Sequence, residues 1–445
     1  MKAISLFSSA GIGDLALHAN GISVLIANEL LEDRASLHRK NFPLTNMMVG
    51  DIWKLKDQLI QSTITSLCGD ELSFLLATPP CQGMSKNGQG KLLQGIRDGK
   101  KPKFDERNRL IIPTLDIVCA LRPRTVVFEN VPEMLDTLIE DENGNAIKIV
   151  DYIKFRLGSE YAGTAEVVQF ADYGVPQRRS RLITIFSRDA HLQAYFSEHG
   201  SYLPPQTHSK DGERGLLRWV SVKETIENLP PLDSKNLESA TSDIQYHRVP
   251  VLDQEKYFWI SNTPPEKGAF DNQCVNPECL YQKNATHGSE HDGNGINKSK
   301  TTTPIFCVKC GALLPRPSAK DEAGQPRLMR GYTSAYKRMS WSLPSPTLTT
   351  NLSYPCSDHK VHPAQNRVLS LYEAFKLHTL DRFDYLWELD NGKPAKDSLI
   401  REVIGESIPP FGLQQIFENL VKISNGVPIK RALKQPEQYR LKLPV

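Results

Sequence analysis

The sequence predicts an α/β protein in which a mostly parallel β-sheet carries helices on both faces and a smaller, loop-rich region follows it. Short apolar runs recur through the first 190 residues, and the long spacings between the first four leave room for crossover helices. Beyond residue 190 the chain becomes rich in Pro, Ser, Thr, Asn and Lys, with weak periodicity. Four of the eight cysteines fall between positions 274 and 310, which indicates a metal-binding module in that second region.

The first region supplies the strands of the predicted sheet. Strands are expected at 3–7, 23–29, 72–77, 125–129, 167–170 and 182–186. The segments 161–171 and 181–187 are close enough in the chain to form a hairpin at the sheet edge. Helical patterns return near Leu369 and between Leu413 and Gly426. We therefore expect a first domain at 1–190, a second domain at 191–395, with a metal module at 274–310 and a mobile insertion at 280–304, and a C-terminal segment at 396–445.

Composition narrows the class of protein. A hydrophobic content of 39% permits a sizeable core, and no apolar stretch approaches the roughly 18 residues of a membrane-spanning helix. The apolar part of the N-terminus is too short for a signal peptide, so we expect a cytoplasmic protein without disulfides. Lys and Arg total 54 against 51 Asp and Glu, but the segment 85–110 carries eight basic and three acidic residues. That local excess of positive charge favours contact with phosphates, although a solvated loop is the alternative.

A turn rich in small residues follows the first expected strand. Such a strand-to-helix turn lets a ligand approach the backbone and the first amides of the next helix. Carboxylates at the next two strand ends, Glu29 and Asp51, could accept hydrogen bonds from ribose hydroxyls and an adenine amine. The candidate cofactor-binding residues in this part of the chain are Phe7, Ser9, Ala10, Gly11, Ile12, Gly13, Glu29, Asp51 and Ile52. A purely structural turn is the alternative.

Cys81 stands in the segment Thr78-Pro79-Pro80-Cys81-Gln82-Gly83, just beyond another expected strand. Most free cysteines are inert, buried small hydrophobes. Cys81 differs because its Pro/Gly loop lies at the carboxyl end of a strand, where open α/β sheets place their sites. The basic cluster after it would favour the thiolate, so Cys81 is a candidate nucleophile.

Two further strand ends carry candidate catalytic groups. Glu129 follows Val126, Val127 and Phe128, and such a partly desolvated carboxyl group has a raised pKa and could hold a proton near neutral pH. Arg179 and Arg181 precede the strand at 182–186 and point to one face in a strand pattern, where they suit an acceptor oxygen. A capping or ion-paired Glu and a solvated turn are the respective alternatives.

The cysteine-rich segment predicts a structural zinc site. Cys307 and Cys310 form a C-x-x-C pair followed by Gly311, a spacing that aims two thiolates at one ion. Cys274 and Cys279 are a looser second pair. We expect one tetrahedral Zn²⁺ bound by these four cysteines; His287 and His291 as ligands, or free thiols, are the alternatives.

Taken in order, these motifs resemble those of the DNA cytosine-5 methyltransferases. The resemblance rests on Pro-Pro-Cys-Gln-Gly at 79–83, Glu-Asn-Val-Pro at 129–132 and Gln-Arg-Arg-Ser-Arg at 177–181, supported by segments 105–110, 367–373 and 404–410. It covers about residues 1–190 and 365–425, and it implies that 1–190 is the catalytic domain, to which the segment at 396–445 returns. The chain departs from the family pattern at Ser9 and Ile12, where many members have Gly, and at Glu406, where Asn is usual.

The resemblance implies a Rossmann-like, S-adenosylmethionine-dependent methyltransferase sheet that acts on cytosine. Cys81 would attack carbon 6 of the base, a protonated Glu129 would donate to ring nitrogen 3, and Arg181, with Arg179 nearby, would hold the ring carbonyl oxygen. Because Cys81 cannot reach a stacked base, the cytosine would leave the duplex. The resemblance adds Pro79, Glu406 and Ser407 to the cofactor-binding residues.

The family likeness also indicates partners. Double-stranded DNA would be the substrate, read by the middle region, and a restriction endonuclease or another defence system would act on the same site. Candidate contacts to phosphates or bases are Lys298, Lys300, Lys309, Arg316, Arg327, Arg330, Lys337 and Arg338. A monomer near the bacterial nucleoid is expected, without membrane contact. The alternatives are a tRNA cytosine-5 methyltransferase and an inactive homologue that only binds DNA.

Overall fold

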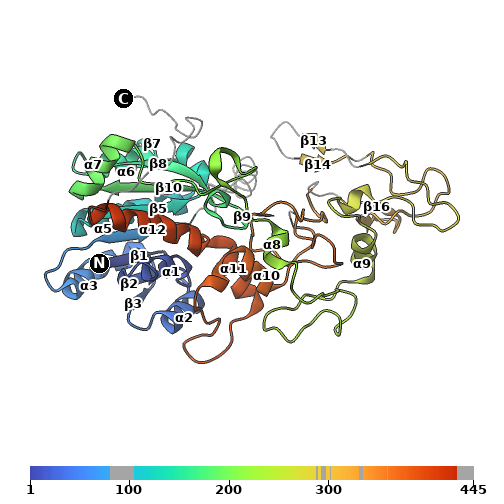
Figure 1. Cartoon of the computed structure of the whole chain (residues 1–445), viewed down its shortest axis with the longest axis horizontal. Coiled ribbons are helices and arrows are strands. Elements are labelled where there is room, and N and C mark those ends of the chain that lie inside the picture. Colours follow the sequence, from blue (N-terminus) through green and yellow to red (C-terminus); the bar gives the residue numbers. More distant parts are fainter. Residues whose placement is uncertain are drawn as a thin grey trace.

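A seven-stranded mixed sheet forms the centre of the larger lobe (Figure 1). The computed structural model describes residues 1–80, 105–286, 289–291, 297–300, 302–329, 334–357 and 359–427. The strand order is β3-β2-β1-β4-β5-β10-β8, with bounds β1 Lys2–Leu6, β2 Ser23–Glu29, β3 Asn46–Val49, β4 Phe74–Ala77, β5 Thr125–Asn130, β8 Ala162–Gln169 and β10 Ser180–Ser187. The first five are parallel, whereas β10 runs antiparallel to both β5 and β8.

The expected fold class is confirmed, including the edge hairpin. Strand β10 pairs with β8 from Ser180 to Ser187, so the two segments nearest in the chain close the sheet on one side. One strand escaped the sequence pattern. Strand β3 has only four residues, Asn-Met-Met-Val, and it lies at the opposite edge with a single buried side chain, Met48. An edge strand of four residues is too short to give a clear periodic signal.

Helices cover both faces of the sheet, as expected. Helices α3 (Ile52–Leu67), α5 (Ile111–Leu121) and α6 (Ile149–Leu157) pack side by side on one face. Helices α1 (Ile12–His18), α12 (Pro410–Ser424) and α7 (Ala190–His199) pack on the other, with α12 in the middle (Figure 1). Helix α12 buries Leu413, Ile416, Phe417 and Leu420, each contributing about 1.5–3 kcal/mol. The last described helix therefore completes the core of the first region.

The remaining elements are short and mostly belong to the second region. They are α2 (Glu32–Asn41), β6 (Leu138–Glu140), β7 (Ala146–Lys148), β9 (Gln177–Arg178), β11 (His208–Ser209), β12 (Leu217–Arg218), α8 (Val222–Ile226), α9 (Gln254–Ser261), β13 (Ser289–His291), β14 (Asn297–Ser299), β15 (Ser318–Lys320), β16 (Pro326–Leu328), β17 (Ser345–Pro346), α10 (Leu371–Leu377) and α11 (Asp397–Glu406). Short 3₁₀ helices lie at Glu106–Leu110, Pro132–Asp136, Phe170–Tyr173, Glu213–Gly215, Ala269–Asp271 and Leu380–Arg382. Of the insertion expected at 280–304, the structure describes 280–286, 289–291, 297–300 and 302–304.

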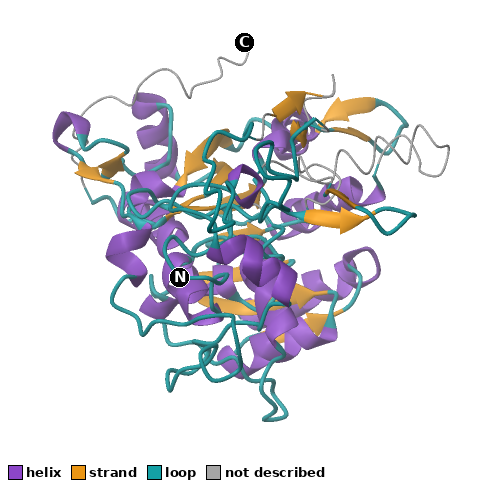
Figure 2. Ribbon diagram, turned by 90° about the vertical axis from the view of Figure 1, so that its right-hand side faces the viewer, coloured by secondary structure: helices purple, strands orange, loops and turns teal. Residues whose placement is uncertain are grey.

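The second region has a small apolar core of its own. Much of its backbone is loop, drawn in teal in Figure 2. Trp259 packs edge-on against Tyr336, with Phe270 and Val361 beside them. A larger apolar cluster, which includes Leu348, Phe375 and Trp387, joins this region to α1 and α11. Buried polar networks organise other parts of the region.

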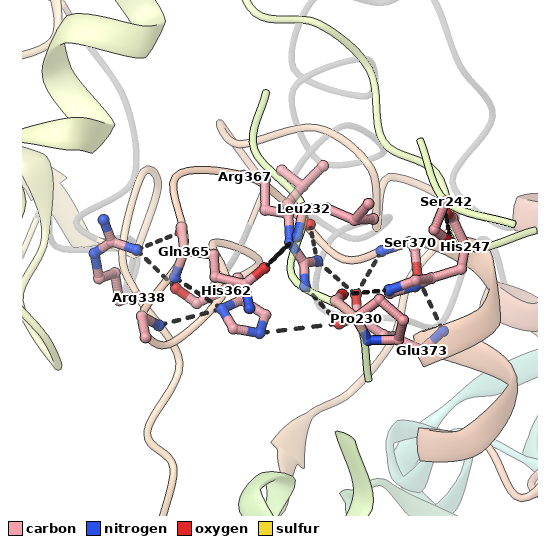
Figure 3. Close-up of polar contacts among 12 residues, drawn as sticks. Pro230, Leu232, Ser242, His247, Arg338, His362, Gln365, Arg367, Ser370 and Glu373 are labelled. Atoms are coloured by element: carbon pink, nitrogen blue, oxygen red, sulfur yellow. Dashed lines mark hydrogen bonds and ion pairs between the residues drawn. The ribbon is translucent and has the colours of Figure 1, made fainter. Parts of the chain in front are cut away.

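Arg338 is the centre of one such network (Figure 3). It is 3% exposed and donates five hydrogen bonds, four of them to main-chain carbonyls, including those of Ile260 and Thr263. Nearby, Arg367 forms a buried two-pronged ion pair with Glu373, which also caps α10 through Ser370. These contacts tie the loops of the second region to a helix.

Arg316, beside the four cysteines, also donates hydrogen bonds to main-chain carbonyls. Its buried guanidinium donates to the carbonyls of Asn272, Ala285 and Pro304. The expectation that Arg316 and Arg338 contact DNA is therefore wrong, because both side chains are enclosed by main-chain carbonyls instead of facing solvent. Within the described residues, no helix combines the length and apolar character needed to cross a membrane.

Candidate active site

A cavity of about 340 Å³ opens at the carboxyl ends of β1, β2, β4 and β5. Strand order reverses there, because β1 lies between β2 and β4, and open α/β sheets bind ligands at such a point. Ten of the predicted cofactor-binding residues line it: Phe7, Ser9, Ile12, Gly13, Glu29, Asp51, Ile52, Pro79, Glu406 and Ser407. The predicted catalytic residues Glu129 and Arg181 line the same cavity.

The turn after β1 has an unusual backbone. Phe7 and Ser9 adopt positive φ angles of 58° and 49°, which cost energy in residues other than glycine and often occur at functional sites. Gly11, with φ 82°, has no room for a side chain, because a Cβ atom there would lie 2.3 Å from the ring of Phe42. The structure places Ala10 and Gly11 in the packing beneath the turn, outside the residues that line the cavity.

Two carboxylates face the cavity from neighbouring strand ends. Glu29 accepts hydrogen bonds from the backbone amides of Ser9, Leu30 and Leu31 at 2.8–2.9 Å, which fixes it at the end of β2. Asp51 caps α3 by accepting from the amide of Trp53 at 3.0 Å. Each carboxylate keeps further lone pairs for a ligand. Together with apolar walls from Phe7, Ile52 and Leu110, they fit a ligand that combines hydroxyl groups with a flat apolar ring.

The sequence reasoning missed a basic residue in this wall. Arg34, on α2, lines the cavity and pairs with Glu406 at the end of α11, with Nη1 and Oε2 2.5 Å apart. Glu402 lies 3.7 Å from the same guanidinium. No local motif identifies Arg34, since its partners are some 370 residues away in the chain. The pair joins the first region to the late cofactor-side segment.

The candidate base-binding groups meet across two antiparallel strands. Glu129 on β5 lies opposite Ile183 on β10, which brings Arg181 alongside, with its Nε 2.9 Å from Oε1 of Glu129. Burial raises the pKa of Glu129, although Arg181 and Arg179 act in the opposite direction. The carboxyl group is thus prepared to hold a proton beside a fixed positive charge.

Asn130 connects this pair to the loop that precedes Cys81. Its Nδ2 donates to the carbonyl of Pro79 at 3.1 Å, and its Oδ1 accepts from the amide of Val131. Pro80, which lines the cavity, is the last described residue before Cys81. Cys81 itself, and the basic cluster as far as residue 104, lie outside the described residues.

Arg179 faces elsewhere. Its buried guanidinium donates to the carbonyl of Leu348 at 2.9 Å and to those of Gly405 and Glu406 at 3.0 and 3.2 Å. Arg179 precedes β10, so the strand alternation expected to align it with Arg181 does not apply to it. It anchors the late cofactor-side segment, and of these two arginines only Arg181 lines the cavity.

The four predicted zinc ligands converge. The sulfur atoms of Cys274, Cys279, Cys307 and Cys310 all lie within 4.8 Å of one another. The distance from Cys274 to Cys310 is 3.7 Å and that from Cys279 to Cys307 is 3.9 Å. A tetrahedral site with Zn–S bonds of about 2.3 Å has sulfur atoms about 3.8 Å apart, whereas a disulfide needs about 2.05 Å. The donor set fits zinc.

Amide groups surround these sulfur atoms. Asn284 donates to the sulfur of Cys307 at 3.8 Å and Asn276 to that of Cys310 at 3.9 Å. Asn284 also accepts from the amide of Val308, which holds the C-x-x-C turn in place. Hydrogen bonds of this kind orient metal ligands and offset thiolate charge. His287 and the side chain of His291 lie outside the described residues.

The fold and the cavity are those of an α/β protein with a ligand site at the switch point of its sheet, lined by strand-end carboxylates and by a buried carboxyl–guanidinium pair. The profile of the family described as C-5 cytosine-specific DNA methylase matches residues 1–422. The chain therefore belongs to the C-5 cytosine-specific DNA methylase family, and the expected enzyme class, a DNA cytosine-5 methyltransferase, is confirmed.

Individual relatives agree with this assignment over nearly the whole chain. The type II methyltransferase M1.HgaI of Avibacterium volantium is 30% identical over 423 residues, which are 93% of this chain and 96% of the relative. The DNA (cytosine-5-)-methyltransferase M.ApeKI of Aeropyrum pernix is 27% identical, and the match covers 95% of this chain and 99% of the relative. A crystal structure from E. coli, provisionally described as a DNA modification methyltransferase encoded within a prophage, shares the fold with a TM-score of 0.53 at 19% identity, covering 96% and 99%.

Proposed function

We propose that this protein transfers a methyl group from S-adenosylmethionine to carbon 5 of a cytosine within one specific double-stranded DNA sequence. The observation that carries the proposal is that two groups of residues line one cavity: the carboxylates Glu29 and Asp51, and the Glu129–Arg181 pair. A cofactor and a flipped base can react only where the residues that bind each of them lie next to one another.

Each catalytic residue has a separate task. The Cys81 thiolate adds to carbon 6 of the flipped cytosine, and Glu129 donates a hydrogen bond from its proton to ring nitrogen 3. Arg181 neutralises negative charge at the ring carbonyl oxygen. After carbon 5 is methylated it gives its proton to a water molecule, the electron pair of that C–H bond reforms the 5,6 double bond, and the sulfur of Cys81 leaves carbon 6 as the thiolate. Arg179 acts indirectly, because its hydrogen bonds hold the backbone at residues 405 and 406.

The cofactor-binding residues suit S-adenosylmethionine. When bound, it supplies an electrophilic methyl group on a sulfonium centre. Glu29 would accept from the ribose hydroxyls and Asp51 from the adenine amine. Phe7 and Ile52 would contact the flat faces of the ring, and Ser407 would contact the amino-acid end.

The second region, which we assign to residues 191–395, would read the DNA sequence. Zinc on the four cysteines would organise it where apolar packing is sparse, as Arg316 does beside it. Arg327 and Lys309 are exposed and stay candidates for phosphate contact. The return of residues 396–445 to the first region is supported by the packing of α12 between α1 and α7.

The description of several relatives as type II methyltransferases supports a biological role in host-DNA protection. The chain would modify a site that a cognate restriction endonuclease or phage-defence nuclease cuts. Bisulfite sequencing of DNA from an expressing host would identify the recognition sequence. A random or absent pattern of modified cytosines would contradict the assignment.

The decisive experiment replaces the nucleophile. Cys81→Ala should abolish transfer of labelled methyl groups to DNA while cofactor binding persists, and Cys356→Ala, an exposed cysteine elsewhere, should retain activity. Turnover by Cys81→Ala would refute the mechanism. Supplying tRNA beside DNA tests the RNA alternative, and inactivity of the wild-type protein on every DNA would favour the inactive homologue.

A further inference from the structure

A fully buried histidine connects the cofactor cavity to the arginine-bearing segment. His378 follows α10 and is 0% exposed. Its Nε2 lies 3.0 Å from Oγ of Ser407, a residue that lines the cavity. Its Nδ1 lies 3.1 Å from the side-chain Nε2 of Gln177. No step of the proposed reaction uses either Gln177 or His378.

Neighbouring backbone groups fix the orientation of the Gln177 side-chain amide. The backbone N–H of Leu348 donates to Oε1 of Gln177 at 3.1 Å, so that atom must be the oxygen. The amide nitrogen also donates to the carbonyl of Leu377 at 3.3 Å. If the amide were flipped, its NH₂ group would face the N–H donor of Leu348, and its oxygen would face the carbonyl acceptor of Leu377. The N–H group of Gln177 therefore faces Nδ1 of His378, which must accept.

This arrangement leaves one tautomer for the imidazole. A ring that accepts at Nδ1 carries its proton on Nε2 and donates there. Burial, followed by the charges of Arg179 and Arg181, lowers the pKa of His378 well below its ordinary value, so the ring stays neutral. A backbone hydrogen bond with Ile408 raises this pKa, but burial outweighs it.

The hydroxyl of Ser407 is constrained as a result. Because Nε2 has no free lone pair, Ser407 receives the hydrogen bond and cannot return one. The hydroxyl of Ser407 can donate its own proton to the carbonyl of Ile404, with Oγ and that oxygen a long 3.4 Å apart, or to a ligand in the cavity. A ligand would thus meet a hydrogen-bond donor at this point.

We infer that His378, oriented by Gln177, is a positioning residue that sets Ser407 as a hydrogen-bond donor toward the cofactor, so that the cavity selects an acceptor oxygen of the ligand at that point. The inference rests on the proposed function for the identity of the cofactor. It assigns a role to two buried side chains that contact neither the cofactor nor the base.

A double-mutant cycle on cofactor affinity tests the inference. Ser407→Ala and His378→Leu should each weaken S-adenosylmethionine binding about tenfold, the effect of losing one hydrogen bond to a charged group. Combined, they should weaken it no further, because His378 acts through Ser407. His378→Gln, which can keep an N–H near the position of Nε2, should stay within about threefold of wild type. Equal losses from His378→Leu with and without Ser407 would overturn the inference.

The tautomer can be observed in the unmodified protein, even if His378→Leu fails to fold. In the ¹⁵N NMR spectrum of histidine-labelled protein, the ring assigned to His378 should carry its proton on Nε2 from mildly acidic to mildly basic pH. A proton on Nδ1, or a charged ring at neutral pH, would overturn the inference even where cofactor binds normally. Failure of the wild-type protein to bind S-adenosylmethionine would instead overturn the proposed function.

Discussion

At the scale of single residues, burial decides which of two similar side chains takes part in chemistry. Arg179 and Arg181 stand two positions apart, yet only Arg181 lines the cavity, while Arg179 is enclosed by main-chain carbonyls. The motif Gln-Arg-Arg-Ser-Arg does not separate them. The difference arises because β10 begins at Ser180, which places Arg181 on the strand and Arg179 before it.

Replacing Glu129 by Gln tests the proton held at ring nitrogen 3. We expect Glu129→Gln to lower methyl transfer by about 10²–10⁴-fold, the usual worth of general acid catalysis. Glu198→Gln, on the exposed face of α7, is the matched control and should leave activity unchanged. Transfer of labelled methyl groups measures both. Full activity of Glu129→Gln would exclude the assigned role.

The pH dependence at Glu129 has a definite sign. Because burial raises its pKa, the folded protein binds this proton more tightly than the unfolded chain does. The resulting stabilisation is present at low pH and is lost as pH rises through the raised pKa. Wild type should therefore lose activity over that range and lose stability relative to Glu129→Gln. Methyl-transfer rates measured across this pH range test the loss of activity, and urea unfolding tests the loss of stability. If wild type instead gained stability relative to Glu129→Gln as pH rises, the prediction would be contradicted.

At the scale of elements, the cofactor cavity is assembled from pieces that lie far apart in the chain. Strand ends of the first region supply its floor, while α11 closes one side through residues 406 and 407. Gly405 permits this approach, since a Cβ atom there would lie 2.2 Å from the backbone nitrogen of Thr350. Arg179 and His378 then hold the same short segment from behind.

The ion pair between α2 and α11 should control cofactor affinity. Arg34→Glu places like charges together and should raise KM for S-adenosylmethionine at least tenfold, with a smaller change in kcat. Adding Glu406→Arg restores opposite charges and should recover most of the affinity. Arg39→Glu breaks another bridge of α2, to Asp390, outside the cavity lining, and should leave KM within about twofold. No recovery in the double variant would show that the pair itself is unimportant.

At the scale of the whole molecule, two regions are stabilised in different ways. The first has apolar cores on both faces of a sheet. The second shares an apolar cluster with α1 and α11 and adds a small aromatic cluster, a four-cysteine site and buried arginines that donate to carbonyls. The two should therefore respond differently to the loss of a metal ion or of a buried charge.

Zinc removal should unfold part of the second region and spare the sheet. We expect about one equivalent of zinc per chain, and Cys307→Ser or chelation should abolish DNA binding while cofactor binding persists. Cys356→Ser, an exposed cysteine outside the cluster, is the control. Hydrogen exchange should show lost protection around residues 274–316 only. A metal content below half an equivalent would contradict the site.

Arg338 should be essential for stability although it lies outside the cavity. Its pKa is lowered by burial only to about 10, so it stays charged at neutral pH and supplies donors to five acceptors. Arg338→Met leaves those acceptors unpaired and should cost at least about 3 kcal/mol. Arg327→Met, at an exposed position, should cost little. Thermal unfolding compares the two, and equal melting temperatures would refute the argument.

The sequence alone determined the features that depend on local order along the chain. Apolar runs located six of the seven sheet strands, and the edge strand β3 was missed because four residues with one buried side chain leave no period. The cysteine spacings located a cluster that the structure brings together. Motif order gave the enzyme class that the family match confirms.

Only the tertiary structure decided which of the candidate residues share a site. Arg34 and Glu406 meet across more than 370 positions, and His378 reaches Ser407 only because α10 and α11 pack together. Likewise, Arg316 and Arg338 read as DNA contacts in sequence but are buried in the fold. The physical reason is that periodicity and spacing report the environment of a few neighbouring residues, whereas burial, charge pairing and proton position depend on what the folded chain places around each group.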